Sequence, residues 1–339
     1  MRALTRTALL VLALGGSGCG GDTQFPLDST GGQGIQAQPG PLARADLLLH
    51  IAHQGVRRVA FAAPSGSSIT FRERITTDGA GHFSIEPVEP LSSTLMDWTA
   101  FDLLQRLREG YLFRYRDFAV RDALLFQRNW RWISIGPETV AARSCERYRV
   151  QRTAGAPALY EVSVDLTNGM VLAYRQLDGS GGVIASMEYE SLELSPDVSG
   201  VAWHQPSNQE SELDWRSDLV AEVGSPILQP RLLPEGYALR AASTVVDGQE
   251  RHWLKLTYLD GVEPLFFLQV LPGGKVQQGV DAGMDWTAGE TPAPVLPKVV
   301  VYQLGSTAVA QGTIGEHELI AIGKVPEAEL LDLIESSLP

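Results

Sequence analysis

The sequence predicts an α+β protein in which antiparallel strands outnumber helices. The clearest observation is a hairpin: apolar and polar residues alternate over 160–166, Asn168-Gly169 follows, and the alternation resumes over 170–174. Asn-Gly between two alternating runs is a strong short-range indication of a β-hairpin. The second observation is that only a few segments have the spacing and punctuation of helices. A meander of antiparallel strands therefore has one or two helices available to cover a face.

Further strands are predicted by the same alternation. Asp-Gly pairs at 178–179 and 260–261 mark turns beside two of them. The predicted strands are residues 69–75, 183–194, 252–258, 264–271, 298–304 and 317–322.

Four helices are predicted, three of them from proline or an N-cap residue at the start and two from glycine after the end, while 209–222 is expected as a short linking helix. The segment 97–109 begins at Asp97, stops before Gly110 and carries one apolar stripe. The four predicted helices are residues 41–54, 97–109, 209–222 and 326–338.

Length and composition set the organisation of the chain. Its 339 residues are enough for about two domains, and a polar stretch at 204–211 predicts the boundary. We expect one domain over 44–204, a linker over 205–232 and a second domain over 233–339. With 40 acidic and 27 basic side chains the net charge is −13, which argues against a nucleic-acid partner.

The N-terminus predicts export. Residues 1–18 combine two arginines, a short apolar run and small residues, which is typical of a secretory signal. Cys19 follows at once, as in a bacterial lipobox, so we expect it to be lipidated and to anchor the protein to a membrane. The alternative is an ordinary cleavage site with Cys19 unmodified. Residues 19–43 then form a flexible tether that holds the protein on the periplasmic side of the inner or outer membrane.

Motifs for common chemistry are missing from the sequence. It contains no nucleophile elbow, phosphate-binding loop, dinucleotide fingerprint or zinc-protease motif, so we expect neither an enzyme nor a cofactor. His50 and His53, three apart on a predicted helix, are half a metal site at best, and no metal is expected. Cys145, the only other cysteine, is interpreted as a small buried apolar residue.

Arginines concentrate in residues 106–131. We take this cluster as a candidate site for an anionic group, such as a lipid phosphate or an acidic partner segment. The alternative is a set of exposed arginines with local ion pairs. The candidate residues are Arg106, Arg108, Arg114 and Arg116.

Aromatic residues surround the arginines. Trp98, Phe101 and Leu104, on the predicted helix 97–109, are candidates to line a cavity for acyl chains. The alternative is ordinary core packing by the same side chains.

Several segments, taken in order, resemble the RseB/MucB family of periplasmic regulators of an envelope-stress sigma factor. The resemblance lies in the order and spacing of the segments, since no single motif is specific. The segments are Arg72 to Gly79, Val140 to Cys145, Tyr160 to Leu194, Leu233-Pro234-Glu235-Gly236-Tyr237, Tyr258-Leu259-Asp260-Gly261-Val262, and Gly315 to Pro326.

The resemblance implies a fold and a partner. The fold is an N-terminal antiparallel half-barrel sheet closed by helices, like LolA and LolB, followed by a smaller α+β C-terminal domain. The partner is the periplasmic part of a membrane anti-sigma factor, or a similar envelope protein, with lipid or lipoprotein acyl chains as a further ligand of the larger domain. We expect a non-enzymatic regulator whose partner surface includes Tyr258, Asp260, Gly261 and the strand 265–271. The alternative is a lipid- or lipoprotein-binding carrier module without a regulatory role.

Overall fold

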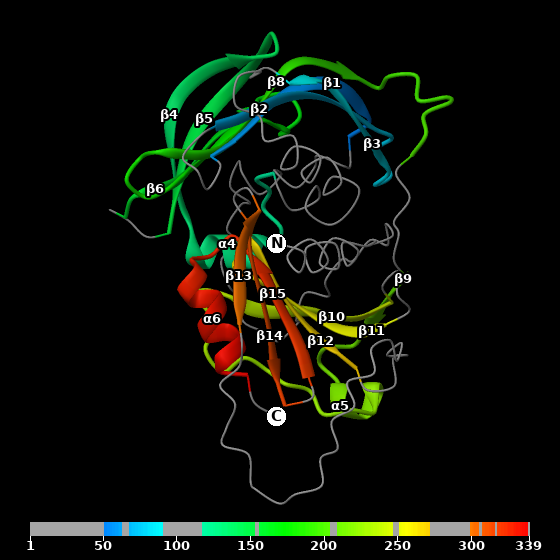
Figure 1. Cartoon of the computed structure of the whole chain (residues 1–339). Helices are drawn as coiled ribbons and strands as arrows, with labels where there is room; N and C mark the ends of the chain where they lie inside the picture. The colour runs from blue at the N-terminus through cyan, green and yellow to red at the C-terminus, as the bar shows by residue number, and fades with distance from the viewer. Residues whose placement is uncertain are drawn as a thin grey trace, which may run out of the picture.

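The computed structural model places two antiparallel sheets one above the other (Figure 1). Helix α4 lies between them and helix α6 lies beside the lower sheet. No helix in the described part of the chain is long and apolar enough to cross a membrane. The structure describes residues 51–62, 68–90, 117–152, 156–203, 209–246, 251–271, 299–304, 307–315 and 317–337.

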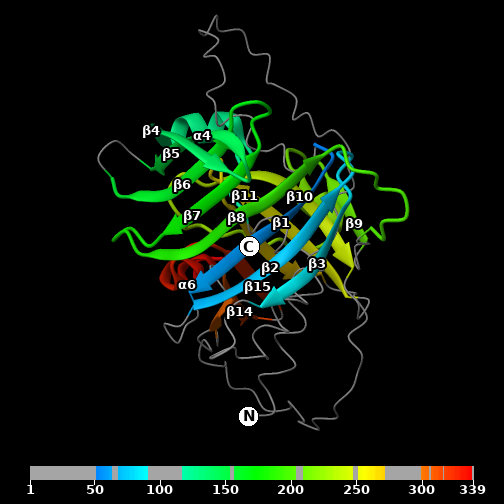
Figure 2. The ribbon, with the colours of Figure 1, turned by 90° about the horizontal axis from the view of Figure 1, so that it is seen from above.

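The first sheet has eight strands in the order β3-β2-β1-β8-β7-β6-β5-β4, all antiparallel to their neighbours. It is open, with β3 and β4 at its edges, and it arches over the second sheet (Figures 1 and 2). The strands are β1 His53–Ala62, β2 Ser68–Thr77, β3 Phe83–Pro90, β4 Arg131–Val140, β5 Arg143–Gln151, β6 Ala158–Asp165, β7 Val171–Leu177 and β8 Val183–Leu194.

Alternation along these strands creates the first core. On β1, Val59 and Phe61 are buried while Arg58 is exposed, and on β7 Tyr174 is buried while Arg175 is exposed. The buried side chains join one cluster that also takes in Val262 of the second sheet. The two sheets therefore share part of one apolar core.

The second sheet has seven strands in the order β13-β14-β15-β12-β11-β10-β9, again antiparallel throughout. Helix α6 packs on β14 and β15, burying Leu330, Leu333 and Ile334. The strands are β9 Gln209–Leu213, β10 Ala238–Val246, β11 His252–Leu259, β12 Pro264–Val270, β13 Val300–Leu304, β14 Thr307–Ile314 and β15 His317–Gly323.

Helices α4 and α5 begin where an aspartate side chain satisfies free backbone N–H groups. The Asp122 side chain accepts a hydrogen bond from Leu125 N at the start of α4 (Ala123–Asn129). Asp218 does the same for α5 (Leu219–Val223), which ends at the left-handed Gly224. Glu327 and Glu329 occupy the first turn of α6 (Glu327–Glu335), where negative charge favours the helix dipole.

The predicted α+β fold, with an antiparallel half-barrel followed by a second α+β unit, is confirmed by the strand order. The hairpin around Asn168-Gly169 is formed by β6 and β7. The last helix and the later strands lie where alternation and spacing predicted them.

The predicted helix 41–54 is wrong at its described end, because β1 begins at His53. Gly55 is not a helix stop but lies inside the strand, where an added Cβ would come within 2.7 Å of the Tyr189 ring. The glycine is needed because another strand's side chain approaches the backbone closely.

The predicted helix 209–222 is also largely wrong. Residues 209–213 are strand β9, which pairs with β10 through Ala242–Val246, and only Leu219–Val223 is helical. Part of the expected linker 205–232 therefore belongs to the second sheet. The predicted signal 1–18, tether 19–43 and helix 97–109 lie outside the described residues.

Candidate functional site at the junction of the two sheets

The turn between β11 and β12, residues 260–263, is the point where the two sheets are joined; we call it the junction turn. Its backbone carbonyls accept hydrogen bonds from the segment that leads into α4 and from the end of that helix. The Gly261 carbonyl accepts a hydrogen bond from Arg121 N at 2.9 Å. The Asp260 carbonyl accepts bonds from Asn129 Nδ2 at 2.9 Å and Trp130 Nε1 at 3.2 Å. A surface turn would leave these acceptors to water, whereas here the first domain satisfies them.

Asp260 holds the turn in shape and carries a buried charge. Its Oδ1 accepts the backbone N–H groups of Val262 and Glu263 at 2.8 and 2.7 Å. Its Oδ2 lies 2.5 Å from Nη2 of Arg152, whose guanidinium stacks over the Trp130 ring at 4.2 Å. Burial raises the pKa of the Asp260 carboxyl, and Arg152 opposes that effect. The ion pair thus stabilises the charge of a carboxylate that is itself fully buried, while the Arg152 side chain stays partly exposed.

Glu263 forms a second ion pair at the junction, with a residue from its own sheet, and accepts a hydrogen bond from the first sheet. Its Oε1 accepts a hydrogen bond from the Tyr160 hydroxyl at 2.6 Å and lies 3.1 Å from the Lys324 ammonium. Both groups are buried, and this burial raises the pKa of Tyr160 and lowers that of Lys324. Removing one member of a buried pair typically costs about 3–5 kcal/mol, because the other charge is left without a partner.

Gly261 fits only because it has no side chain. Its φ of 109° lies in the left-handed half of conformational space, which other residues occupy at a cost. An added Cβ would also lie 2.6 Å from the Cα atom of Phe126 in α4. Backbone therefore packs directly on backbone where the sheets meet.

A second buried polar group extends from the junction into the first sheet. Arg121 donates to the carbonyls of Val262 and Asp117 and so connects the two. The Asp117 carboxylate lies 2.7 Å from Arg57 Nη1, and Glu73 lies 2.5 Å from Arg57 Nη2. All three of these charged side chains are buried, so β1 and β2 are tied to the segment that enters α4.

His53 lies at the far end of this polar group. Its Nε2 is 2.8 Å from the Tyr189 hydroxyl and its Nδ1 is 2.8 Å from the Ile51 carbonyl. The ring is fully buried, and burial lowers its pKa to about 4. His53 is therefore a neutral core residue on β1 and does not lie on the helix that the sequence predicted. His50, its proposed neighbour, lies outside the described residues.

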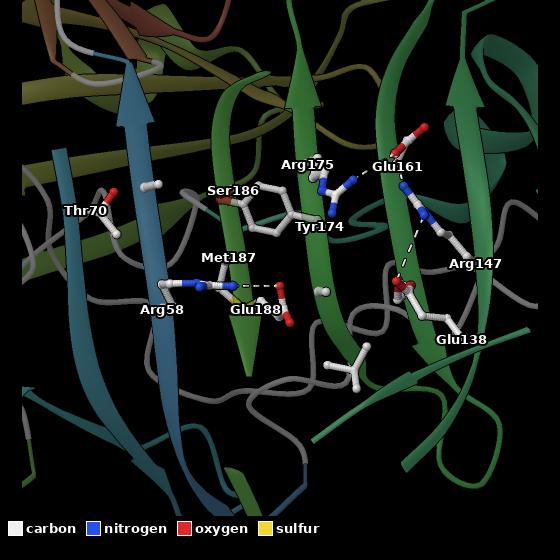
Figure 3. Close-up of a pocket in the computed structure, with 14 residues that line it drawn as sticks. Arg58, Thr70, Glu138, Arg147, Glu161, Tyr174, Arg175, Ser186, Met187 and Glu188 are labelled. Carbon is white, nitrogen blue, oxygen red and sulfur yellow. Dashed lines mark hydrogen bonds and ion pairs between the residues drawn. The ribbon is translucent and has the colours of Figure 1, made fainter. Parts of the chain in front are cut away.

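A pocket of about 320 Å³ lies on the outer face of the first sheet (Figure 3). It is lined by the charged side chains that alternate with the core residues. Arg58 is 3.3 Å from Glu188, and Glu161 pairs with Arg147 and lies 3.8 Å from Arg175. The charges thus neutralise one another across neighbouring strands, which is the usual role of such pairs on a sheet face.

The predicted partner surface is not free in this structure. Tyr258 and Asp260 are 4% and 0% exposed, and Gly261 is buried. The expectation that this turn faces a partner is corrected, because α4 and Arg152 of the first domain occupy the place. The strand 265–271 is largely buried as well.

The remaining predicted site residues cannot be placed, because they lie outside the described residues. They are the anchor Cys19, the cavity candidates Trp98, Phe101 and Leu104, and the arginines Arg106, Arg108, Arg114 and Arg116. Cys145 is 1% exposed, and burial raises the pKa of its thiol to about 11, in keeping with a small core residue.

Sequence reasoning missed the residues that make the junction polar. Asn129, Arg152, Glu263 and Lys324 come from four separate places in the chain, and only Lys324 lies inside one of the segments that resemble the family. The one available indication was the Asp260-Gly261 pair, which identified the turn but not what covers it.

Comparison with family models and with curated proteins gave no match. Among solved structures, the chain is similar to MucB in complex with MucA(peri), with a TM-score of 0.48, 16% identity, and coverage of 89% of this chain and 97% of that chain. A Pseudomonas aeruginosa MucA/MucB complex gives a TM-score of 0.48, 15% identity, and coverage of 88% and 96%. A LolA superfamily protein from Nitrosomonas europaea gives a TM-score of 0.20, 11% identity, and coverage of 50% and 99%.

The first two of these structures contain MucB, which is one of the two proteins that give the RseB/MucB family its name. The fold class itself rests on the strand pairing described above.

Substitution of Gly261 tests the close packing at the junction. We expect Gly261→Ala to lower the melting temperature by several degrees, since the new Cβ adds overpacking of about 1–3 kcal/mol to the strain of a positive φ. The matched control is Gly200→Ala, where φ is 83° and nothing lies within 4 Å of the added Cβ. Equal losses in the two variants would show that the contact with α4 contributes nothing.

The buried His53 predicts a pH-dependent stability. Above about pH 6.5 the imidazole is neutral in the folded and in the unfolded chain. Below that pH the unfolded chain binds a proton, whereas the folded chain binds it only near pH 4. We therefore expect up to roughly 3 kcal/mol of stability to be lost as pH falls through this window. Urea unfolding of wild type and His53→Gln at several pH values measures the contribution of His53 to the free energy of unfolding. His82→Gln, at an exposed position, is the control. A constant difference between wild type and His53→Gln would contradict the assignment.

Proposed function

We propose that this protein is an exported, lipid-anchored binding protein of the RseB/MucB kind, and not an enzyme. Its partner is the periplasmic segment of a membrane-spanning envelope protein, such as an anti-sigma factor. Cys19 would hold it at the membrane on the side where that segment lies.

The observation that carries the proposal is that three of the segments resembling the family come together at the junction turn. The Leu233–Tyr237 motif supplies the Gly236 carbonyl, which accepts a bond from Asn129 at 2.7 Å. The Tyr258–Val262 motif forms most of the junction turn, and the Gly315–Pro326 motif supplies Lys324. Segments far apart in the sequence thus resemble one family and build one structural feature.

The chemistry of this feature suits structure better than catalysis. Each junction carboxylate is neutralised by a cation and buried: Asp260 by Arg152, and Glu263 by Lys324. A general acid or base must reach a substrate proton, whereas these groups reach only their own chain. The junction fixes the relation of two sheets, which is what a protein needs to present a wide surface to a partner.

Affinity purification tests the partner. The full-length tagged protein is recovered from detergent-solubilised envelopes, and co-purifying proteins are identified by mass spectrometry against an unrelated lipoprotein with the same tag. We expect enrichment of one membrane protein with a single span and a cytoplasmic sigma-binding segment. A broad set of lipoproteins or bound acyl chains, with no dominant protein, would contradict the regulator and favour the carrier module.

The lipid anchor is tested separately by Cys19→Ser. We expect this variant to leave the membrane fraction and appear in the soluble periplasmic extract, because a single residue carries the acyl chains. Unchanged retention in the membrane fraction would show that something other than Cys19 holds the protein there.

A further inference from the structure

Strand β4 ends the first sheet on one side. Within the described ranges it pairs only with β5, from Arg131 opposite Gln151 to Val140 opposite Arg143. An edge strand presents N–H and C=O groups that can take up a further strand. The regular pairing is interrupted by a bulge between Ser134 and Gly136, and Pro137, which lacks an N–H, follows. The usable edge is therefore its first half.

This half of β4 is apolar and exposed. Ile133 and Ile135 are 50% and 40% exposed, and Leu124 on the preceding helix α4 is 65% exposed. Proteins commonly guard an edge strand with charged residues that point inward, or cover it. Here Arg131, Ile133 and Ile135 are all exposed, so large apolar side chains lie beside the open edge.

The same region is positively charged in an acidic protein. Residues 123–137 contain two arginines and no Asp or Glu, whereas the whole chain has a net charge of −13. Arg128 and Arg131 are exposed. Arg131 donates to the main-chain carbonyls of Gln127 and Trp130, each at 2.8 Å. In the described part of the chain, neither arginine has a carboxylate partner.

We infer that one strip of this surface binds an extended acidic and apolar polypeptide segment of the partner as an added strand. The strip consists of Leu124, Arg128, Arg131, Ile133 and Ile135. The inference rests on the proposed function and names the surface that it uses. Main-chain bonds to β4 supply affinity, and Ile133 selects apolar side chains at alternate positions. The two arginines attract acidic residues and favour a partner of charge opposite to the strip.

Synthetic peptides test the inference on the whole protein. The probe is a fluorescent peptide of about eight residues that alternates glutamate and valine, measured by anisotropy. We expect binding that weakens at least about tenfold when lysine replaces glutamate, or when alternate backbone nitrogens are methylated. Equal binding of the lysine peptide would overturn the charge match, and equal binding of the methylated peptide would overturn strand addition.

Matched variants locate the site. We expect Ile133→Glu and Arg128→Glu each to weaken the acidic peptide several-fold. Val183→Glu, at a 51% exposed position on β8, and Arg216→Glu, at an exposed position between β9 and α5, are expected to leave binding unchanged. Circular dichroism and the melting temperature confirm that each variant is folded. An equal effect of control and test variants would overturn the site.

Three further outcomes separate this inference from the proposed function. If Ile133→Glu still enriches the same envelope partner as wild type, the strip is not the partner surface, and the proposed function stands. If wild type forms a dimer by light scattering and Ile133→Glu abolishes it, the strip belongs to a second copy of the chain and the inference is overturned. If wild type enriches no partner, the proposed function fails, whatever the peptides show.

Discussion

Buried charge at the contact between the two sheets is the constraint on which the rest of the structure depends. Two carboxylates, Asp260 and Glu263, lie in one turn and are both removed from water. Such charges are tolerable only while their cations stay in place. Arg152 follows β5 of the first sheet, whereas Lys324 follows β15 of the same sheet as the turn, so Asp260 keeps its cation only when the two sheets are assembled.

The polar contacts extend well beyond the turn. Arg121 links the Val262 carbonyl to Asp117, and Asp117 pairs with Arg57 in β1. The strand pairs at the centre of the half-barrel are thus connected to the junction by buried bonds, each of which loses its partner if its neighbour moves. We regard the first domain and the junction turn as one cooperative unit for this reason.

The sequence predicted what is locally determined. Alternation identified β6, β7, β8, β11 and β12, and proline with two acidic residues identified α6. It failed at β1 and β9, where glycine, histidine and glutamate interrupt the apolar pattern. His53 and Glu210 are polar because they meet Tyr189 and Lys255 on other strands, which local spacing cannot reveal.

The candidate site shows the same limit. The Asp260-Gly261 pair predicted a turn correctly, and turns are usually exposed. Its burial depends on Asn129, Trp130 and Arg152, more than one hundred residues away in sequence. By contrast, the arginine-rich composition was visible in advance: of its described residues, Arg128 and Arg131 lie beside the open edge of β4, and Arg121 lies at the junction.

The most direct test of this account is amide hydrogen exchange on the full-length protein. The informative amides are Arg121, which donates to the Gly261 carbonyl, and Val262 and Glu263, which donate to the Asp260 side chain. The account predicts that all three exchange slowly, with one common opening free energy, and that Lys324→Met speeds them together. Fast exchange at the junction while β1, β7 and β8 stay protected would show that the two sheets are not held together by this turn.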